Sequence, residues 1–335
     1  MIQFQCDYNE GAHPLIMERL METNMNQTLG YGEDEYCEDA RRLIREACDC
    51  PDADVHFLVG GPQTNTTVIS AVLKPYQGVL APVSGHINCH ESGAIEATGH
   101  KVLTLPCDRA GKITAEQIEK AVLDHYSDPS HEHIVQPGMV YISNPTENGE
   151  IYYKAELEAI SAVCRKYDLP LYADGARLGY GLAAEGNDVT LADMARCCDV
   201  FYIGGTKVGA LFGEAVVITN DKLKKHFRYM IKQNGGMLAK GRLLGIQFQV
   251  LFENGLYQEI SAHAVRMAMK IKKAFVDLGY ELYAEVPTNQ QIVVLTDAVR
   301  DKLAEKYEFG FWENLEDGRS AHRFCTSWGT KEENV

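Results

Sequence analysis

Three groups of residues that could do chemistry each follow a strand-like segment of this 335-residue sequence. The first is the glycine-rich run 60–65 (GGPQTN), which lies between the apolar segment 55–59 and a helical pattern. Glycines let the backbone approach a ligand closely, and the unpaired N–H groups at a helix start favour a phosphate. The second is Asp174, whose buried carboxylate would require a cationic partner. The third is Lys207, whose amine becomes a usable nucleophile where apolar surroundings lower its pKa.

Each group also has an ordinary interpretation. The glycine-rich run would serve equally as a plain turn, Asp174 as a helix N-cap and Lys207 as a solvated surface lysine. The run matches neither the dinucleotide-binding nor the nucleoside-triphosphate-binding glycine pattern, which argues against those ligands. Taken together, a phosphate site, an acid for a ring nitrogen and a lysine for a Schiff base are what pyridoxal 5′-phosphate (PLP) requires.

The first 240 residues alternate between strand-like and helix-like segments. A helix is expected over 155–167, because Leu157, Ile160 and Val163 recur at helical spacing. Strands that alternate with helices form βαβ units, so we expect an α/β fold with a mostly parallel sheet covered by helices on both faces. Ligands of such sheets bind beyond the carboxyl ends of the strands, where the three groups lie. The expected strands are 55–59, 78–82, 101–106, 139–143, 169–173, 200–203 and 215–218.

The pattern changes near residue 241, where two long helical segments begin. We therefore expect two domains: a three-layer PLP-binding domain, 1–240, which includes the N-terminal segment, and a smaller α+β domain, 241–335. The smaller domain is expected to contain helices over 241–255, 258–278 and 297–306 and strands over 280–284, 291–296 and 321–326.

Composition and charge exclude several classes of protein. The chain is 45% hydrophobic and 24% charged, which excludes wholesale disorder, and its net charge of −15 argues against nucleic acid or an anionic membrane as the main partner. The sequence has no apolar stretch of the about 18–20 residues that a membrane span needs. It also does not begin like a signal peptide, so we expect a cytoplasmic protein. The closely spaced pairs among its ten cysteines do not fit a zinc site, so no metal is expected.

An ordered set of motifs resembles a known family. The spacing of 33 residues between Asp174 and Lys207, after a phosphate loop, resembles the aspartate-aminotransferase-like fold, also called fold type I. Over about residues 1–330 the chain also resembles the threonine aldolases of the β-eliminating lyase group. The motifs that carry this resemblance are 7–14 (DYNEGAHP), 30–34 (GYGED), 85–86 (GH) with 91–93 (ESG), 174–177 (DGAR) and 323–326 (RFCT).

The resemblance implies roles for individual residues toward PLP. Lys207 would hold PLP as a Schiff base, Asp174 would pair with its pyridine nitrogen, and His86 would stack on its ring and handle the proton of the substrate β-hydroxyl. The family's phosphate loop has threonine where this chain has Pro62, so phosphate contact would rest on neighbouring positions. The implied cofactor-binding residues are Gly61, Gln63, Thr64, His86, Asp174, Arg177, Thr206 and Lys207.

The resemblance also implies a substrate site shared between subunits. Arg177 and Arg323 would bind the substrate carboxylate, and Tyr31 would reach the site of a neighbouring subunit in a homodimer or homotetramer. Cys6 stands where the family has a carboxylate-binding serine. Glu147 stands where many members have a second histidine, and it would act there as a base or simply be solvated.

The expected function is PLP-dependent cleavage of L-threonine or L-allo-threonine to glycine and acetaldehyde, by breaking the Cα–Cβ bond. Another PLP reaction on the same fold, such as β-elimination, transamination or racemisation, would use the same Lys207 and Asp174 and stays open. A non-catalytic α/β ligand-binding protein is a further alternative. A nicotinamide-dependent dehydrogenase lacks its glycine fingerprint here.

Overall fold

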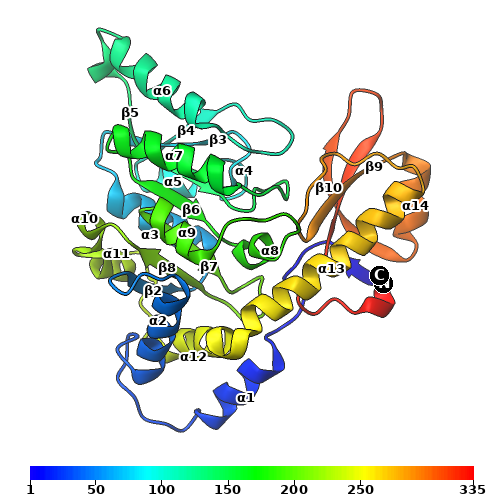
Figure 1. Cartoon of the computed structure of the whole chain (residues 1–335), viewed down its shortest axis with the longest axis horizontal. Helices are drawn as coiled ribbons and strands as arrows, with labels where there is room; N and C mark the ends of the chain where they lie inside the picture. The colour runs from blue at the N-terminus through cyan, green and yellow to red at the C-terminus, as the bar shows by residue number, and fades with distance from the viewer.

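The computed structural model describes residues 1–335 and contains two sheets that lie side by side, joined by a long helix (Figure 1). The larger sheet has seven strands in the order β2-β8-β7-β6-β5-β3-β4. All neighbouring strands are parallel except at β8, which is antiparallel to β2 and to β7. The strands are β2 (Asp54–Leu58), β3 (Gln77–Pro82), β4 (Lys101–Leu105), β5 (Gln136–Ser143), β6 (Leu171–Asp174), β7 (Val200–Gly204) and β8 (Glu214–Ile218).

Helices cover both faces of this sheet, because alternate strand residues point to opposite sides. In β7, for example, Phe201 and Ile203 join one hydrophobic core, while Val200 and Tyr202 join the other. The first core includes residues of α2 (Glu35–Ala47), α6 (Ala115–Ser127), α7 (Lys154–Lys166), α8 (Leu178–Leu182) and α9 (Leu191–Cys197). The second includes residues of α3 (Gly61–Val72), α4 (His86–Cys89), α5 (Ala94–Ala97) and α11 (Phe227–Gln233), with α10 (Asp221–Lys224) beside it.

The smaller sheet has four strands in the order β1-β10-β11-β9. Helix α13 (Leu256–Asp277) runs from the large sheet to this one, packing against α8 at one end and β9 at the other (Figure 1). The strands are β1 (Ile2–Phe4), β9 (Gln290–Leu295), β10 (Tyr307–Asn314) and β11 (Ser320–Cys325). The remaining helices are α1 (Pro14–Glu22), α12 (Arg242–Phe252), α14 (Asp297–Ala304) and the 3₁₀ turns His131–His133, Glu253–Gly255 and Glu332–Asn334.

The structure confirms the mostly parallel, helix-covered sheet and each of its seven expected strands. The expected strand 280–284 is wrong, since only Leu282 forms a single bridge, to Val293. Strands β1 and β10 were not expected; β10 has partly exposed residues throughout, so it lacks the continuous apolar run of a buried strand. The division into two domains at residue 240 stays a prediction. Two elements cross it: β1, before residue 240, belongs to the smaller sheet, and α12, after residue 240, packs mainly against α2.

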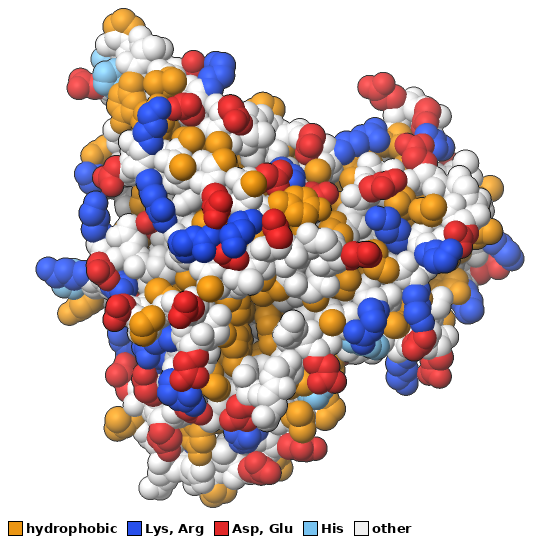
Figure 2. Space-filling model, viewed as in Figure 1, with side chains coloured by type: hydrophobic (Ala, Val, Ile, Leu, Met, Phe, Trp, Pro, Cys, Tyr) orange, Lys and Arg blue, Asp and Glu red, His pale blue; other side chains and the backbone are white.

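The polarity of the strands brings several loops to one edge of the large sheet. Strands β2, β5, β6 and β7 end at this edge, and the antiparallel β8 begins there with Glu214. None of the helices combines the length and the apolar character that a membrane crossing needs. On the face seen in Figure 2, acidic and basic side chains are interspersed rather than gathered by sign.

Candidate active site

A cleft opens at this edge of the large sheet and extends toward the smaller sheet. Tyr8, His86, Glu147, Arg177 and Lys207 line both its inner and its outer part. The inner part is also lined by Val59, Gly60, Gly61, Pro62, Ser143, Pro145, Asp174, Ala176, Tyr202, Thr206 and Glu214. The outer part is also lined by Ser84, Cys89, His90, Asn148, Tyr283, Phe311, Trp312, Glu313 and Arg323.

Asp174, at the end of β6, is a buried carboxylate with four hydrogen-bond donors. Its Oδ2 accepts from Tyr141 at 2.9 Å and from the Asn65 amide at 3.2 Å. Its Oδ1 accepts from Tyr202 at 2.5 Å and from the backbone N–H of Ala176 at 3.0 Å. These contacts satisfy both oxygens and hold them at the floor of the cleft, as a partner for a protonated ring nitrogen requires.

Lys207 follows β7 and lies in both parts of the cleft. The Tyr180 hydroxyl donates to its backbone carbonyl at 2.5 Å, which holds the loop that carries it. Burial is the main cause that lowers the pKa of Lys207, and the Arg177 guanidinium lowers it further. A lower pKa leaves more of the amine uncharged and therefore nucleophilic.

A chain of hydrogen bonds links His86 to Asp174. His86 Nδ1 lies 2.7 Å from Glu91 Oε1, and the Asn65 amide donates both to Glu91 at 2.7 Å and to Asp174. Because the carboxylate can only accept, we assign the proton to Nδ1, which leaves Nε2 as an acceptor. The Tyr172 hydroxyl donates to Asn65 at 2.7 Å and fixes the orientation of that amide.

Arg177 is held by Asp7 in a bidentate ion pair that the resemblance to the threonine aldolases did not imply. Its Nε and Nη2 lie 2.6 and 2.9 Å from the two oxygens of Asp7, which also accepts from Asn289. Burial alone would raise the pKa of Asp7, but Arg177 and Lys207 lower it to about 2. The pair uses two of the five N–H donors of Arg177, so both hydrogens of Nη1 and one of Nη2 are left for a substrate carboxylate. The sequence held one indication of this partner, since Asp7 is the first residue of the motif 7–14.

Arg323 reaches the outer part of the cleft from β11 of the smaller sheet. Its Nη1 donates to Gln290 at 3.1 Å and its Nη2 to the backbone carbonyl of Gln5 at 3.3 Å. Its Nε is buried without a partner, and the guanidinium carbon lies 5.5 Å from the centre of the Trp312 ring. The cleft therefore offers guanidinium groups from both sheets.

Glu147 is buried rather than solvated. Its Oε1 accepts from Ser143 at 2.6 Å and from the backbone N–H of His86 at 2.8 Å, while its Oε2 is buried without a partner. Burial is the main cause that raises the pKa of Glu147, and the Asp174 charge adds to it. A carboxyl group with a raised pKa and a free oxygen is suited to proton transfer.

The end of the cleft near the start of α3 is suited to an anion. Gly60 and Gly61 line it, α3 contains no charged residue, and a β-carbon at Gly61 would lie 3.3 Å from the Tyr202 hydroxyl. Gln63 instead caps the preceding loop, accepting from the Val59 N–H at 3.2 Å and donating to a backbone carbonyl.

The buried side chain of Thr64 is outside the cleft lining, as is that of Gln63. The anion end, Asp174 and Lys207 thus fit the phosphate, ring nitrogen and aldehyde of PLP. Contact with the phosphate would fall to the glycine backbone, the amino end of α3 and Thr206.

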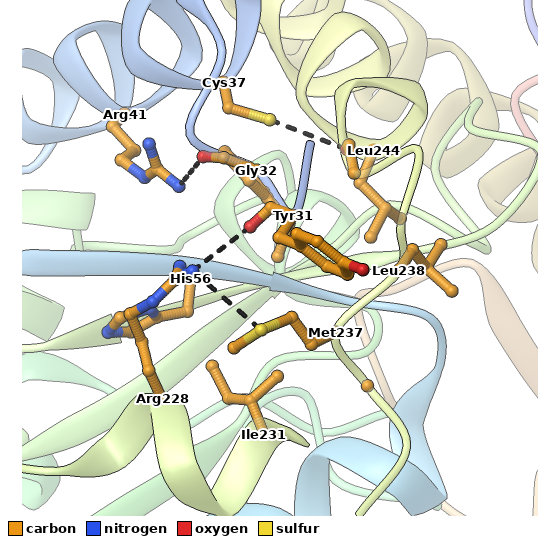
Figure 3. Close-up of a pocket in the computed structure, with 13 residues that line it drawn as sticks. Tyr31, Gly32, Cys37, Arg41, His56, Arg228, Ile231, Met237, Leu238 and Leu244 are labelled. Carbon is orange, nitrogen blue, oxygen red and sulfur yellow. Dashed lines mark hydrogen bonds between the residues drawn. The ribbon is translucent and has the colours of Figure 1, made fainter. Parts of the chain in front are cut away.

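Two further expected site residues lie outside the cleft of their own chain. The Cys6 thiol contacts Asn9 at 3.0 Å and is not among the lining residues. Tyr31 lies in a separate small pocket, where Figure 3 shows it beside Arg228 and Met237. Arg228 donates to its backbone carbonyl at 3.3 Å, and the amine of Lys232 lies 4.7 Å from its ring centre.

Comparison with known proteins identifies relatives over nearly the whole chain. The sequence model of the β-eliminating lyase family matches residues 5–298. Low-specificity L-threonine aldolases from Pseudomonas sp. (strain NCIMB 10558) and Pseudomonas aeruginosa are 30% and 29% identical, each over 99% of this chain and 94% of the relative.

Solved structures of related proteins have the same fold as this chain. The threonine aldolase of Leishmania major is 46% identical with a TM-score of 0.96, over 99% of this chain and 96% of that one. The aspartate aminotransferase of Thermus thermophilus is 14% identical with a TM-score of 0.74, over 100% of this chain and 88% of that one. The second likeness shows the fold alone, and it confirms the expected aspartate-aminotransferase-like fold.

The pair between Asp7 and Arg177 predicts a pH-dependent loss of stability. We expect Asp7→Asn to lower the free energy of unfolding by about 3 kcal/mol at neutral pH, because Arg177 is left buried without an anion. Since the pKa of Asp7 is lowered to about 2, the advantage of the unsubstituted protein is present above the unfolded pKa of about 4 and shrinks as the pH falls toward 2. Urea unfolding at several pH values measures it.

The control is Asp277→Asn, which removes an exposed ion pair with Lys273. It should cost less than about 1 kcal/mol. An equal loss for both variants would show that the buried pair has no special role in stability.

Proposed function

Because the chain belongs to the β-eliminating lyase family and is related to the L-threonine aldolases along its whole length, we propose that it cleaves L-threonine or L-allo-threonine to glycine and acetaldehyde. The enzyme is a PLP-dependent lyase. The observation that carries the proposal is the meeting of Lys207, Asp174 and Arg323 in one cleft, with two candidate proton acceptors beside them.

Each part of the cleft has a separate task toward PLP. Lys207 would hold the cofactor's aldehyde, Asp174 its ring nitrogen, and the start of α3 its phosphate, while His86 would lie against its ring. When bound, PLP supplies an electron-accepting ring that stabilises negative charge on the substrate Cα after the Cα–Cβ bond breaks. The buried position of Asp174 strengthens its electrostatic effect, because little water screens it.

The cations of the outer cleft orient the substrate. Arg323 and Arg177 both line the outer cleft, and Arg177 keeps N–H donors on Nη1 and Nη2 outside its pair with Asp7, so we place the substrate carboxylate between these two guanidinium groups. Fixing the carboxylate sets the direction of the bond to Cβ relative to the floor of the cleft. The β-hydroxyl would then face the side lined by His86 and Glu147.

Cleavage requires a base that takes the proton of the β-hydroxyl as the carbon–carbon bond breaks. We assign this role to Glu147, because its side chain lines both parts of the cleft and its raised pKa makes it more basic than an ordinary carboxylate. His86, oriented by Glu91, would position the hydroxyl through Nε2. The same proton can return to the product, since release of glycine requires one proton at Cα.

Substitution of the cofactor lysine tests the assignment of PLP. We expect Lys207→Ala to lose the visible absorption of the bound cofactor together with acetaldehyde formation from L-threonine. Lys222→Ala, which removes an exposed lysine paired with Asp168, should retain both. Cleavage by Lys207→Ala at the unsubstituted rate would make the assignment wrong. Ammonia and a keto acid as products would point to another PLP reaction, and a colourless purified protein to a binding function.

Glu147→Gln tests the proton acceptor. We expect kcat to fall by about 100-fold while the cofactor absorption stays unchanged, because the amide keeps the shape but cannot take a proton. In the unsubstituted enzyme kcat should fall as the pH drops below the raised pKa of Glu147, where the carboxyl group is protonated. If Glu147→Gln keeps its rate and His86→Asn loses it, the acceptor is His86.

We propose that the enzyme is a homodimer, or a tetramer of two such dimers, in which Tyr31 of one chain completes the site of the other. Tyr31 is 48% exposed and lies outside its own cleft, although Arg228 and the carbonyl of Ala239 hold its backbone at a φ of 61°. The segment that precedes Tyr31 also has several exposed apolar side chains: Leu15, Met17, Met21, Met25 and Leu29. Exposed apolar surface of this kind is often covered at a protein–protein interface.

Mixing two defective variants tests the shared site. Lys207→Ala and Tyr31→Ala should each lose most of their activity, because each damages a different part of every site. A hybrid dimer contains one intact site, so refolding the variants together should restore acetaldehyde formation. Full activity of Tyr31→Ala, a monomeric mass by light scattering, or no recovery on mixing would contradict the proposal.

We also propose that the enzyme works in the cytoplasm. All ten of its cysteines are free thiols in the structure, which suits a reducing compartment. Cell fractionation followed by the acetaldehyde assay would check this, and activity confined to a membrane or secreted fraction would contradict it.

A further inference from the structure

Glu214 is a buried carboxyl group at the anion end of the cleft, and no step proposed above uses it. It is 3% exposed and begins β8, where it lies opposite Leu58 of β2 and Gly204 of β7. Those two strands continue directly into Gly60 and Thr206. Glu214 therefore lies between the two loops that would enclose the phosphate of PLP, and it lines the same inner cleft.

The hydrogen bonds of Glu214 occupy the hydroxyl that the phosphate would need. Thr206 Oγ1 donates to Glu214 Oε1 at 2.8 Å, and the N–H of Gly205 donates to Oε2 at 3.0 Å. The same Oγ1 accepts from the N–H of Gly213 at 3.0 Å. A hydroxyl has one hydrogen. While Thr206 donates it to Glu214, it cannot donate it to a phosphate.

A second anion beside Glu214 also creates an electrostatic conflict. The charged groups that face Glu214 are Lys207, after β7, and Asp174, at the end of β6. Helix α3 has no charged residue to offset the repulsion, and α12 packs against the turn before β8 through Leu244 and Phe248. The other titratable groups facing it are neutral hydroxyls, those of Tyr172, Tyr202 and Tyr257.

We propose that Glu214 positions the cofactor phosphate as a neutral carboxylic acid, taking up one proton from solvent when the phosphate binds. The acid hydrogen is donated to Thr206 Oγ1, and Thr206 turns its own hydrogen toward the phosphate. The N–H of Gly205 still donates to the second oxygen of Glu214, so no buried group loses its partner. The change moves one proton and breaks no other covalent bond. The inference rests on the proposed function, because it assumes PLP as the ligand.

The electrostatics of the site agree with this arrangement. Burial raises the pKa of Glu214 to about 7, although Thr206 and Lys207 act in the opposite direction. Below this pH the acid form already predominates and phosphate binding needs no added proton. Above it, each binding event must protonate Glu214, so the affinity for PLP should fall by up to about tenfold per pH unit.

Cofactor affinity measured against pH tests the inference. The apoenzyme, prepared from the holoenzyme, is titrated with PLP between pH 6 and pH 9 and followed by absorbance. Glu214→Gln is the key variant, because its amide donates to Thr206 and accepts from Gly205 at every pH. We expect equal Kd values within about threefold at pH 6 and, at pH 9, binding to the variant at least tenfold tighter than to the unsubstituted enzyme. Parallel pH profiles would show that Glu214 only holds the loop and would overturn the inference.

Calorimetry in buffers of different ionisation enthalpy counts the proton directly. At pH 8 the unsubstituted enzyme should take up about one more proton per PLP than Glu214→Gln. Pyridoxal, which lacks the phosphate, should show no such difference between the two proteins. An equal excess with pyridoxal would assign the proton to the chemistry of Lys207 and overturn the inference.

Substitution of Thr206 checks the route from Glu214 to the phosphate. Thr206→Val should weaken PLP binding and remove the difference between Glu and Gln at position 214. Thr219→Val is the matched control, because it removes a threonine hydroxyl at the other end of the same hairpin, bonded to the Cys198 carbonyl. If Glu214→Gln still changes the pH profile in the Thr206→Val background, the route through Thr206 is wrong. Failure of the unsubstituted apoenzyme to bind PLP would overturn the proposed cofactor as well.

Discussion

The carboxylate of Asp174 organises the centre of the molecule. It is a charge placed at the buried end of β6, and it is stable there only because β5, β7 and α3 each supply a donor through Tyr141, Tyr202 and Asn65. These donors require the strands to approach closely: a β-carbon at Gly175 would lie 1.9 Å from the Tyr202 carbonyl. The anion thus joins β5, β6, β7 and α3 at the edge of the sheet where Lys207 and the start of α3 line the same cleft.

The same constraint repeats around the cleft, where Asp7, Glu91, Glu147 and Glu214 are also buried. Each accepts a hydrogen bond from a group at the cleft: Asp7 from a guanidinium, Glu91 from an imidazole, Glu147 from a backbone N–H and Glu214 from a hydroxyl. The site is thus rich in anions although its ligands are themselves anions. The net charge of −15 therefore does not decide which ligands bind in the cleft. Binding depends instead on a few local cations and on which carboxyl groups are protonated.

The sequence alone was sufficient to predict the large sheet and the residues that its strand ends bring into the cleft. Alternating segments predicted all seven strands of the large sheet, and Asp174 and Lys207 lie in the cleft as expected. Contacts between distant segments could not be predicted, because no local pattern shows that Asp7 meets Arg177 or that Glu214 meets Thr206. Gln63 illustrates the same limit: it lies in the loop expected to hold the phosphate, but its side chain turns away from the cleft to cap that loop.

The first strand has a mechanical consequence for the enzyme. Residues 2–4 form the edge strand of the smaller sheet, and the carbonyl of the next residue, Gln5, accepts a hydrogen bond from Arg323. Two residues later, Asp7 forms the ion pair with Arg177, which follows β6 of the large sheet. Seven residues therefore act as a short tether across the cleft. A hinge motion that moves Arg323 away from the cofactor pulls on the partner of Arg177 as well. Such a motion should consequently displace Arg177 and Arg323 together, so that the two arginines proposed to bind the substrate carboxylate would respond to one movement rather than two.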